Sequence, residues 1–213
     1  HGVWLERAGV APDKEAAYLQ YREASSFLRG EGFRQDSMRR FVRQGKERGF
    51  SECGMGTSLA LGCGGRSYVG NLHFCSPYVI TGKECLKRLE EYENTVDFTD
   101  IGHGILLSEE EIKRRYLIRH LLIYPGVDIQ KYKKHFKTGL MEDFPVLQEW
   151  MEQGFIQWKE DGKEGIQEGE KFLALTETGL GLSDYLGPQL ISDEIRKAME
   201  EWEEMHGQPY DII

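Results

Sequence analysis

The sequence predicts an α/β protein made of two units, which differ in the order of their elements and in their charge. Residues 1–105 run strand, helix, strand, loop, strand, an order typical of α/β layers but too short to close a barrel. Residues 106–213 run through three helices, a β-hairpin and further helices, which indicates an α+β domain. Charge supports the division: residues 1–100 carry 14 acidic and 14 basic side chains, whereas residues 101–213 carry 22 and 13.

In the N-terminal unit, a helix is the best-marked element. Asp13 is its N-cap, apolar residues follow at helical spacing, and Gly30 and Gly32 end it. Residues 58–74 read as a buried strand interrupted by glycines. In order, the expected elements are a strand at 3–5, a helix at 14–29, a strand at 33–42, a polar loop at 45–56, the buried strand at 58–74 and a short helix at 83–92.

The C-terminal unit opens on a capping box, in which Ser108 is the N-cap and Glu111 stands at the third helical position. A hairpin pattern surrounds the sequence DGKEG near residue 163. The expected helices span residues 108–122, 129–136, 144–152, 178–186 and 191–205. Helices followed by a β-wing and another helix are the layout of a winged-helix fold.

Composition excludes several classes of protein. With 39% hydrophobic and 30% charged residues, the 213-residue chain is neither disordered nor embedded in a membrane. Its longest apolar stretch, residues 58–63, is far short of the ~20 residues of a spanning helix. No secretory leader is visible, so we expect a cytoplasmic protein with its four cysteines reduced. Because a strand already begins at residue 3, we also expect the chain to be part of something larger.

A glycine run, residues 62–65, resembles a phosphate cradle at first sight. A dinucleotide fingerprint must follow a strand and open a helix, whereas this run lies inside the expected strand. Two interpretations stay open: the backbone approaches a flat ligand closely, or the glycines relieve crowding at a barrel corner.

Basic residues gather just before this run and suggest an anion site, although a solvated charged face is the alternative. Arg66 stands out because a charge within an apolar strand needs a partner. The cluster consists of Arg34, Arg39, Arg40, Arg43, Lys46 and Arg48.

Metal and DNA sites are not expected. Cys53, Cys63, His73 and Cys75 are separated by gaps of nine, nine and one residues, unlike zinc or iron–sulfur spacings, so buried thiols are the better interpretation. The candidate recognition helix near residues 141–154 carries acidic residues and no basic ones, which disfavours duplex binding.

Four segments together carry a resemblance to a known family. They are EGFRQDSMRRFVRQG (31–45), LALGCGGRSYVGN (59–71), LSEEEIKRRYLIRHLL (107–122) and LALTETGLGLSDYLGPQLIS (173–192). In this order they resemble the C-terminal portion of the oxygen-independent coproporphyrinogen III oxidase-like radical SAM proteins. The SDYLGP and HFCSPY stretches look more like an uncharacterised subgroup of that family.

The resemblance implies a partial β/α barrel that holds a 4Fe-4S cluster and S-adenosylmethionine, with a winged-helix-like domain covering the active site. The family's cluster ligands form a CxxxCxxC motif, which this chain does not contain. We therefore expect this chain alone to be inactive and to need the N-terminal barrel half as its partner. The alternatives are a haem or tetrapyrrole carrier without turnover and a winged-helix domain that binds a partner.

The resemblance also assigns site residues. Arg66 matches the point where the glycine-rich strand touches S-adenosylmethionine. From their charge alone, Arg39 and Arg40 would face propionate groups if the substrate is a porphyrin-like tetrapyrrole. Met38 would line the substrate side with these two arginines. The implied cofactor-side residues are Gln35, Phe50, Gly62, Gly64, Gly65 and Arg66.

Overall fold

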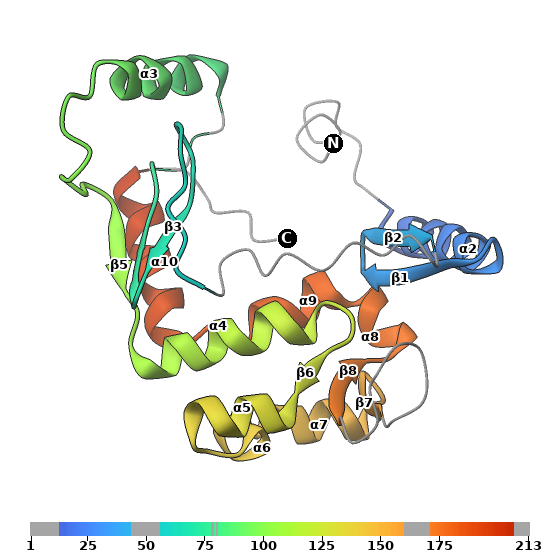
Figure 1. The fold of residues 1–213 in the computed structure, drawn as a ribbon. Helices are drawn as coiled ribbons and strands as arrows, with labels where there is room; N and C mark the ends of the chain where they lie inside the picture. Colours follow the sequence, from blue (N-terminus) through green and yellow to red (C-terminus); the bar gives the residue numbers. More distant parts are fainter. Residues whose placement is uncertain (1–12, 44–55, 78, 80, 160–170, 207–213) are drawn as a thin grey trace. The chain divides into compact units, whose positions relative to one another are not determined.

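A computed structural model gives the fold (Figure 1). It describes residues 13–43, 56–77, 79, 81–159 and 171–206. Contacts divide the chain into a discontinuous unit, residues 1–48 with 117–213, and an inserted unit, residues 49–116. These contact-based units change over at residues 48 and 116. The boundary expected near residue 105 stays a prediction.

The discontinuous unit begins with the predicted helix, α2 (Lys14–Gly30). Its N-cap is confirmed, since the Asp13 carboxylate accepts a hydrogen bond from the Ala16 amide at 2.9 Å. The single strand expected over residues 33–42 is wrong. The chain reverses at residues 38–39 to form an antiparallel hairpin, β1 (Phe33–Ser37) with β2 (Arg40–Arg43). Strand alternation looks the same on both sides of a two-residue turn, so the pattern alone did not reveal the reversal.

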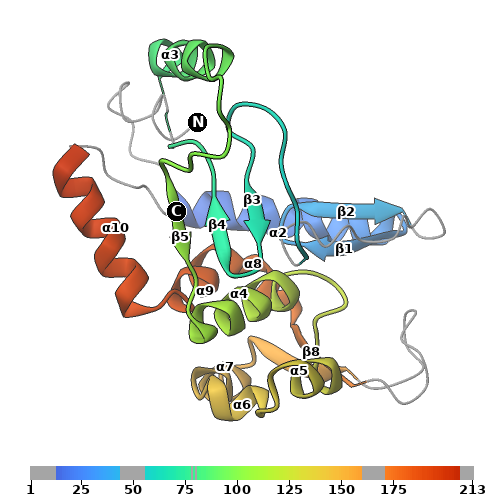
Figure 2. The same cartoon turned by 60° about the vertical axis from the view of Figure 1, so that its left-hand side comes forward.

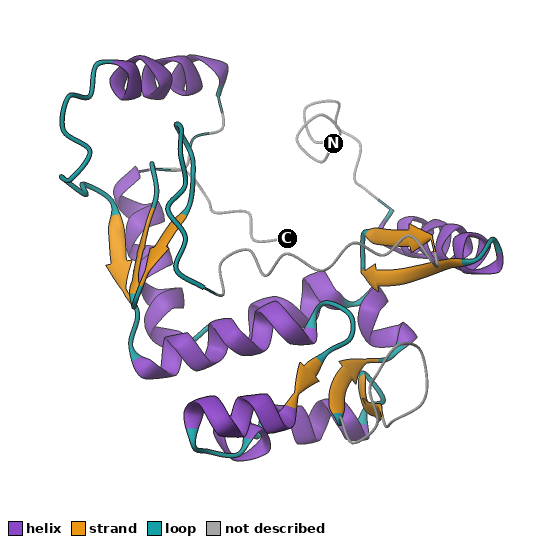
Figure 3. Ribbon diagram, in the orientation of Figure 1, coloured by secondary structure: helices purple, strands orange, loops and turns teal. Residues whose placement is uncertain are grey.

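Helices surround a small antiparallel sheet in the C-terminal part of this unit (Figure 3). The Glu111 amide donates to the Ser108 hydroxyl at 3.2 Å, as the expected cap requires. The core contains Leu117, Tyr132, Trp150 and Leu173, each at most 2% exposed. The elements are α4 (Glu109–Leu121), which begins in the inserted unit, β6 (Val127–Asp128), α5 (Ile129–Phe136), α6 (Leu140–Asp143), α7 (Val146–Glu152), β7 (Ile156–Lys159) and β8 (Phe172–Leu175).

Three helices close the unit: α8 (Glu177–Gly181), α9 (Ser183–Gln189) and α10 (Asp193–His206). The helix expected over residues 178–186 is divided at Leu182, whose backbone leaves helical geometry at φ −107° and ψ 14°. The β7 and β8 strands confirm the predicted hairpin, while its turn lies outside the described residues. The expected strand at residues 3–5 also lies outside them.

In its described residues, the inserted unit contains a three-stranded antiparallel sheet, the helix α3 and the start of α4 (Figure 2). The strands are β3 (Ser67–Val69), β4 (Leu72–Phe74) and β5 (Gly104–Leu106), and the helix is α3 (Gly82–Glu93), which begins with a Thr81–Glu84 capping box.

The buried strand expected over residues 58–74 is wrong. Gly62 and Gly64 take positive φ angles of 100° and 79°, which a strand does not allow, and Leu61 is 91% exposed. A Gly70–Asn71 turn then separates β3 from β4. All pairings between named strands in the described residues are antiparallel, so the partial barrel and its parallel strands stay a prediction.

None of the helices in the described part of the chain is long and apolar enough to cross a membrane.

Candidate functional site

A hollow of about 760 Å³ lies in the inserted unit, between the loop that precedes β3 and the helix α3 with the loop that follows it. This volume is within the range of small-molecule pockets, roughly 300–1,000 Å³. Its lining residues include Leu59, Leu61, Phe74, Arg88, Glu91, Tyr92, Asp97, Phe98 and Asp100.

The loop before β3 is held by hydrogen bonds along its length. Ser58 and Tyr68 exchange two backbone hydrogen bonds of 2.7 Å, and the Ala60 amide donates to the Ser67 hydroxyl at 3.1 Å. At the hollow, the Gly62 amide donates to the Tyr92 hydroxyl at 3.1 Å. The glycine-rich loop is therefore attached to α3, on the opposite side of the hollow.

Crowding explains one glycine of the run. A Cβ built on Gly65 would lie 2.7 Å from the Cβ of Ala60, whereas at Gly62 and Gly64 it would meet nothing within 4 Å. The lack of a side chain at Gly65 therefore lets the chain at residue 65 pass close to Ala60. Gly62 and Gly64 supply positive φ angles, and the space where their side chains would stand is open.

We expect Gly65→Ala to destabilise the inserted unit by about 1–3 kcal/mol, as overpacking does. Hydrogen–deuterium exchange of residues 67–74 measures this as lower protection. The double variant Ala60→Gly with Gly65→Ala should recover part of the loss, because the Ala60 methyl group is the nearest atom. No recovery in the double variant would show that this contact is not the cause.

On the β3–β4 hairpin, the cross-strand pair Tyr68 and His73 is stacked, with ring centroids 4.2 Å apart. The Arg115 guanidinium lies 3.7 Å from the centroid of the same Tyr68 ring. The Nε2 atom of His73 is buried and has no hydrogen-bond partner among the described residues. Burial, and then the charges of Arg115 and Arg66 and the neighbouring His103, hold the pKa of His73 below its ordinary value of 6.5.

The lowered pKa of His73 predicts that acid loosens this hairpin. The unfolded chain binds the proton at a higher pH than the folded chain, so stability is full above about pH 6.5 and falls as the pH drops through the folded pKa. Protection factors of residues 67–74 should fall over that range. His73→Phe should flatten this dependence, whereas His135→Gln, at an exposed position, should leave it unchanged. If protection in the His73→Phe variant depended on pH as steeply as in the unchanged protein, His73 would not be the cause of the pH dependence.

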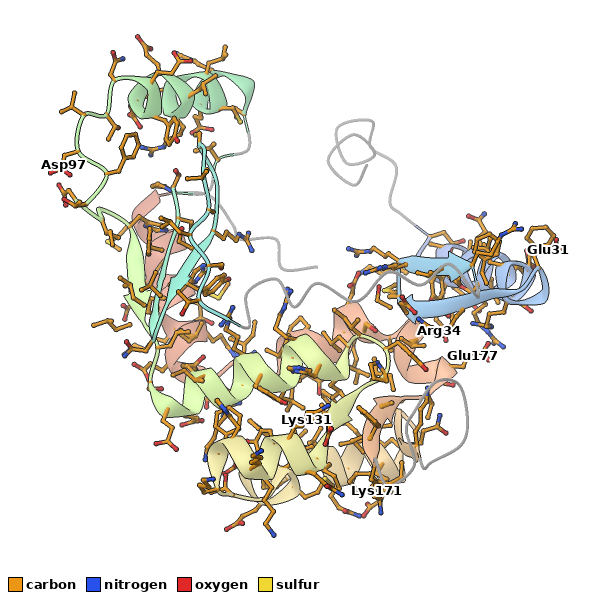
Figure 4. The ribbon with its side chains drawn as sticks, viewed as in Figure 1. Glu31, Arg34, Asp97, Lys131, Lys171 and Glu177 are labelled. Carbon is orange, nitrogen blue, oxygen red and sulfur yellow. The ribbon has the colours of Figure 1, made fainter. Side chains whose placement is uncertain are left out.

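Acidic side chains dominate the charge of the hollow. Arg88 is the one guanidinium among its described lining residues, and it donates to Glu91 at 2.7 Å. The Asp97 carboxylate, on the loop that leaves α3 (Figure 4), accepts hydrogen bonds from the Thr99 hydroxyl at 2.6 Å and amide at 2.8 Å. These hydrogen bonds lower the pKa of Asp97, so it stays ionised.

Four of the expected site residues lie in the discontinuous unit, on β1, on β2 or in the turn between them: Gln35, Met38, Arg39 and Arg40. Gln35 is buried and its amide is engaged: the oxygen accepts from Arg29 at 2.8 Å, and the nitrogen donates to the Tyr21 hydroxyl at 2.7 Å and the Met38 carbonyl at 3.3 Å.

Both arginines expected to face propionates are paired within their own unit. Arg39 pairs with Asp184, and the Arg40 guanidinium lies 3.7 Å from the Asp36 carboxylate. Each already has a carboxylate partner.

The remaining cofactor-side residues lie in the inserted unit, and Gly62 lines the hollow. The inference that Arg66 is buried is wrong: it is exposed, because residues 59–66 form a loop rather than a buried strand. Phe50 lies outside the described residues. Sequence reasoning missed Tyr92, Asp97 and Phe98, which stand in a stretch interpreted only as the end of a helix and a polar linker; aromatic and acidic residues alternating after a helix were the available signal.

The residues present do not fit an iron–sulfur cluster. Among the described residues no three His, Cys, Asp or Glu side chains gather as a metal site. Cys63 and Cys85 are exposed and Cys75 is half-buried, so buried thiols are wrong for the first two. Cys53 lies outside the described residues. The CxxxCxxC motif is absent from the chain.

Helices combined with small antiparallel sheets define a mixed α/β protein. No protein-family model matches the chain, and no curated protein matches it. Among solved structures, the chain is similar to the coproporphyrinogen III oxidase HemN from Escherichia coli, a radical SAM enzyme. The TM-score is 0.52 at 17% identity, over 84% of this chain and 41% of HemN. The similarity shows a HemN-like fold, and the chain spans less than half of HemN's length.

Proposed function

We propose that this chain is the C-terminal part of a radical SAM oxidoreductase resembling oxygen-independent coproporphyrinogen III oxidase, and that it shapes the pocket for S-adenosylmethionine and substrate. The observation that carries the proposal is the fold similarity to HemN over 84% of the chain. The motif segment 173–192 supports it, because it forms the continuous stretch β8, α8 and α9 rather than unrelated loops.

In this proposal, S-adenosylmethionine binds against the glycine-rich loop. At Gly62 and Gly64 a Cβ would meet nothing within 4 Å, so a flat ring can approach the backbone there. When bound beside a reduced cluster, this cofactor supplies a radical that abstracts hydrogen from substrate. The cluster ligands would come from the N-terminal barrel half, and the segments of this chain would orient the ligands and exclude water.

The C-terminal elements would form a winged-helix-like domain. Support comes from the order of the elements, which run α4, β6, α5, the two short helices α6 and α7, and then the β7–β8 hairpin. A winged-helix layout predicts helices followed by such a hairpin. The acidic α7 region, with Glu149 and Glu152, argues against binding of a nucleic-acid duplex.

The test starts with the coding sequence upstream of His1. A reading frame of roughly 150–250 further residues, the size of the missing barrel portion, with a CxxxCxxC motif would support the proposal. The full-length protein, reconstituted anaerobically, should then cleave S-adenosylmethionine to 5′-deoxyadenosine, and a variant lacking the first cysteine of the motif should not. A start codon immediately before His1 would overturn the enzyme proposal. Haem binding without cleavage would favour the tetrapyrrole carrier.

A further inference from the structure

We infer that the hollow of the inserted unit takes a flat, apolar ligand whose end beside Asp97 and Asp100 is neutral or positively charged, and that it disfavours a tetrapyrrole with propionate groups there. The inference rests on the proposed function for treating the hollow as a ligand pocket. It concerns the charge of the substrate, which fold similarity does not assign.

The apolar part of the ligand follows from the exposed side chains around the hollow. Phe98 is 61% exposed, and Leu59 and Leu61 on the opposite loop are 68% and 91% exposed. The rings of Tyr92 and Phe98 are 5.3 Å apart and tilted by 57°, so their faces do not cover one another. Aromatic and aliphatic surface left open on both sides of a hollow favours a ligand that buries it.

The charge of the ligand follows from the carboxylates. The lining contains Glu91, Asp97 and Asp100 against Arg88, and Arg88 is already paired with Glu91. Asp97 is held by both hydrogen bonds from Thr99 and stays ionised. An anionic group placed here would meet like charge, whereas a cationic group would gain both Coulomb attraction and contact with the aromatic rings.

The arginines that could reverse this preference are paired with carboxylates or are not among the described lining residues of the hollow. Arg39 pairs with Asp184 and Arg40 with Asp36 in the discontinuous unit. Arg66 is not among the described residues that line the hollow. The expectation that arginines receive substrate propionates therefore finds no support in the inserted unit.

Two probes with the same ring and opposite charge test the inference. We would titrate the full chain with N,N,N-trimethyl-2-naphthylammonium and with 2-naphthoate, and measure both dissociation constants by probe fluorescence at low salt. The cation should bind about tenfold more tightly, the size expected for one or two charge contacts in a partly hydrated site.

Variants locate the preference. Asp97→Asn with Asp100→Asn should remove most of the tenfold difference, whereas Asp193→Asn with Glu194→Gln, which removes the same charge from α10, should keep it. Phe98→Ala should weaken both probes. The inference is overturned if neither probe binds, if 2-naphthoate binds as tightly as the cation, if the hollow's double variant keeps the full difference, or if Phe98→Ala leaves both affinities unchanged.

The two proposals fail separately. Loss of the probe preference with intact cleavage of S-adenosylmethionine by the full-length protein would reject only the charge assignment. Intact preference without cleavage would reject only the radical enzyme.

Discussion

Asp36→Asn is expected to lower the free energy of unfolding of the discontinuous unit by roughly 3 kcal/mol, the usual cost of breaking a buried ion pair. The Asp36 side chain is 9% exposed and accepts a hydrogen bond from the Arg34 guanidinium at 2.8 Å. Its backbone carbonyl also accepts from the Tyr124 amide at 2.7 Å, and Arg34 lies 3.9 Å from the centroid of the Tyr124 ring (Figure 4 labels Arg34). Asparagine would leave the half-buried guanidinium without that counter-charge.

Urea unfolding followed by tryptophan fluorescence measures this loss, because Trp150 is buried in the same unit. The matched control is Asp184→Asn, the same change in the exposed pair with Arg39, which should cost less than about 1 kcal/mol. Equal, small losses in both variants would show that the burial of Asp36 does not matter.

Gly179→Ala should be at least as damaging, with a loss of about 3 kcal/mol or more. A Cβ on Gly179 would lie 2.0 Å from the backbone oxygen of Phe155, which cannot move aside as a flexible side chain could. That oxygen also accepts from the Thr176 amide at 2.9 Å, and the Thr176 hydroxyl caps α8 through the Gly179 amide at 3.1 Å. Alanine would therefore displace the start of α8 from the strand beside it.

The same fluorescence assay applies, with Gly30→Ala as its control. Gly30 is the last residue of α2, and a Cβ there would meet nothing within 4 Å. Alanine favours a helix over glycine by up to about 1 kcal/mol, so this control should be neutral or slightly stabilising. A Gly179→Ala variant as stable as Gly30→Ala would contradict the close approach seen in the structure.

Local signals predicted the helices well. Asp13 caps α2, Ser108 caps α4, and the helix predicted over residues 129–136 has those bounds in the structure. Each depends on contacts within a few residues, which the sequence displays directly. The hairpin of β7 and β8 was predicted from the strand-like pattern on the two sides of the sequence DGKEG.

Errors arose where the chain turns back on itself or bends at a glycine. Residues 33–42 and 58–74 both alternate like single strands, and both contain reversals. The largest errors concerned which residues make up the candidate site. Residues of β1 and β2 that were grouped with the glycine run lie in another unit, and the side chains opposite that run, Tyr92 and Phe98, come from a segment about 30 residues later.

By itself, the sequence determined most helix positions, the mixed α/β class, the absence of a CxxxCxxC motif and the resemblance that the fold similarity to HemN supports. Only the tertiary structure decided the roles of individual side chains. It placed a carboxylate beside Arg39 and beside Arg40, gave Gly65 and Gly179 a packing reason, and brought acidic and aromatic groups around one hollow. Helix caps and composition depend on near neighbours along the chain. Ion pairs, close approaches and cavities depend on residues that meet only after folding.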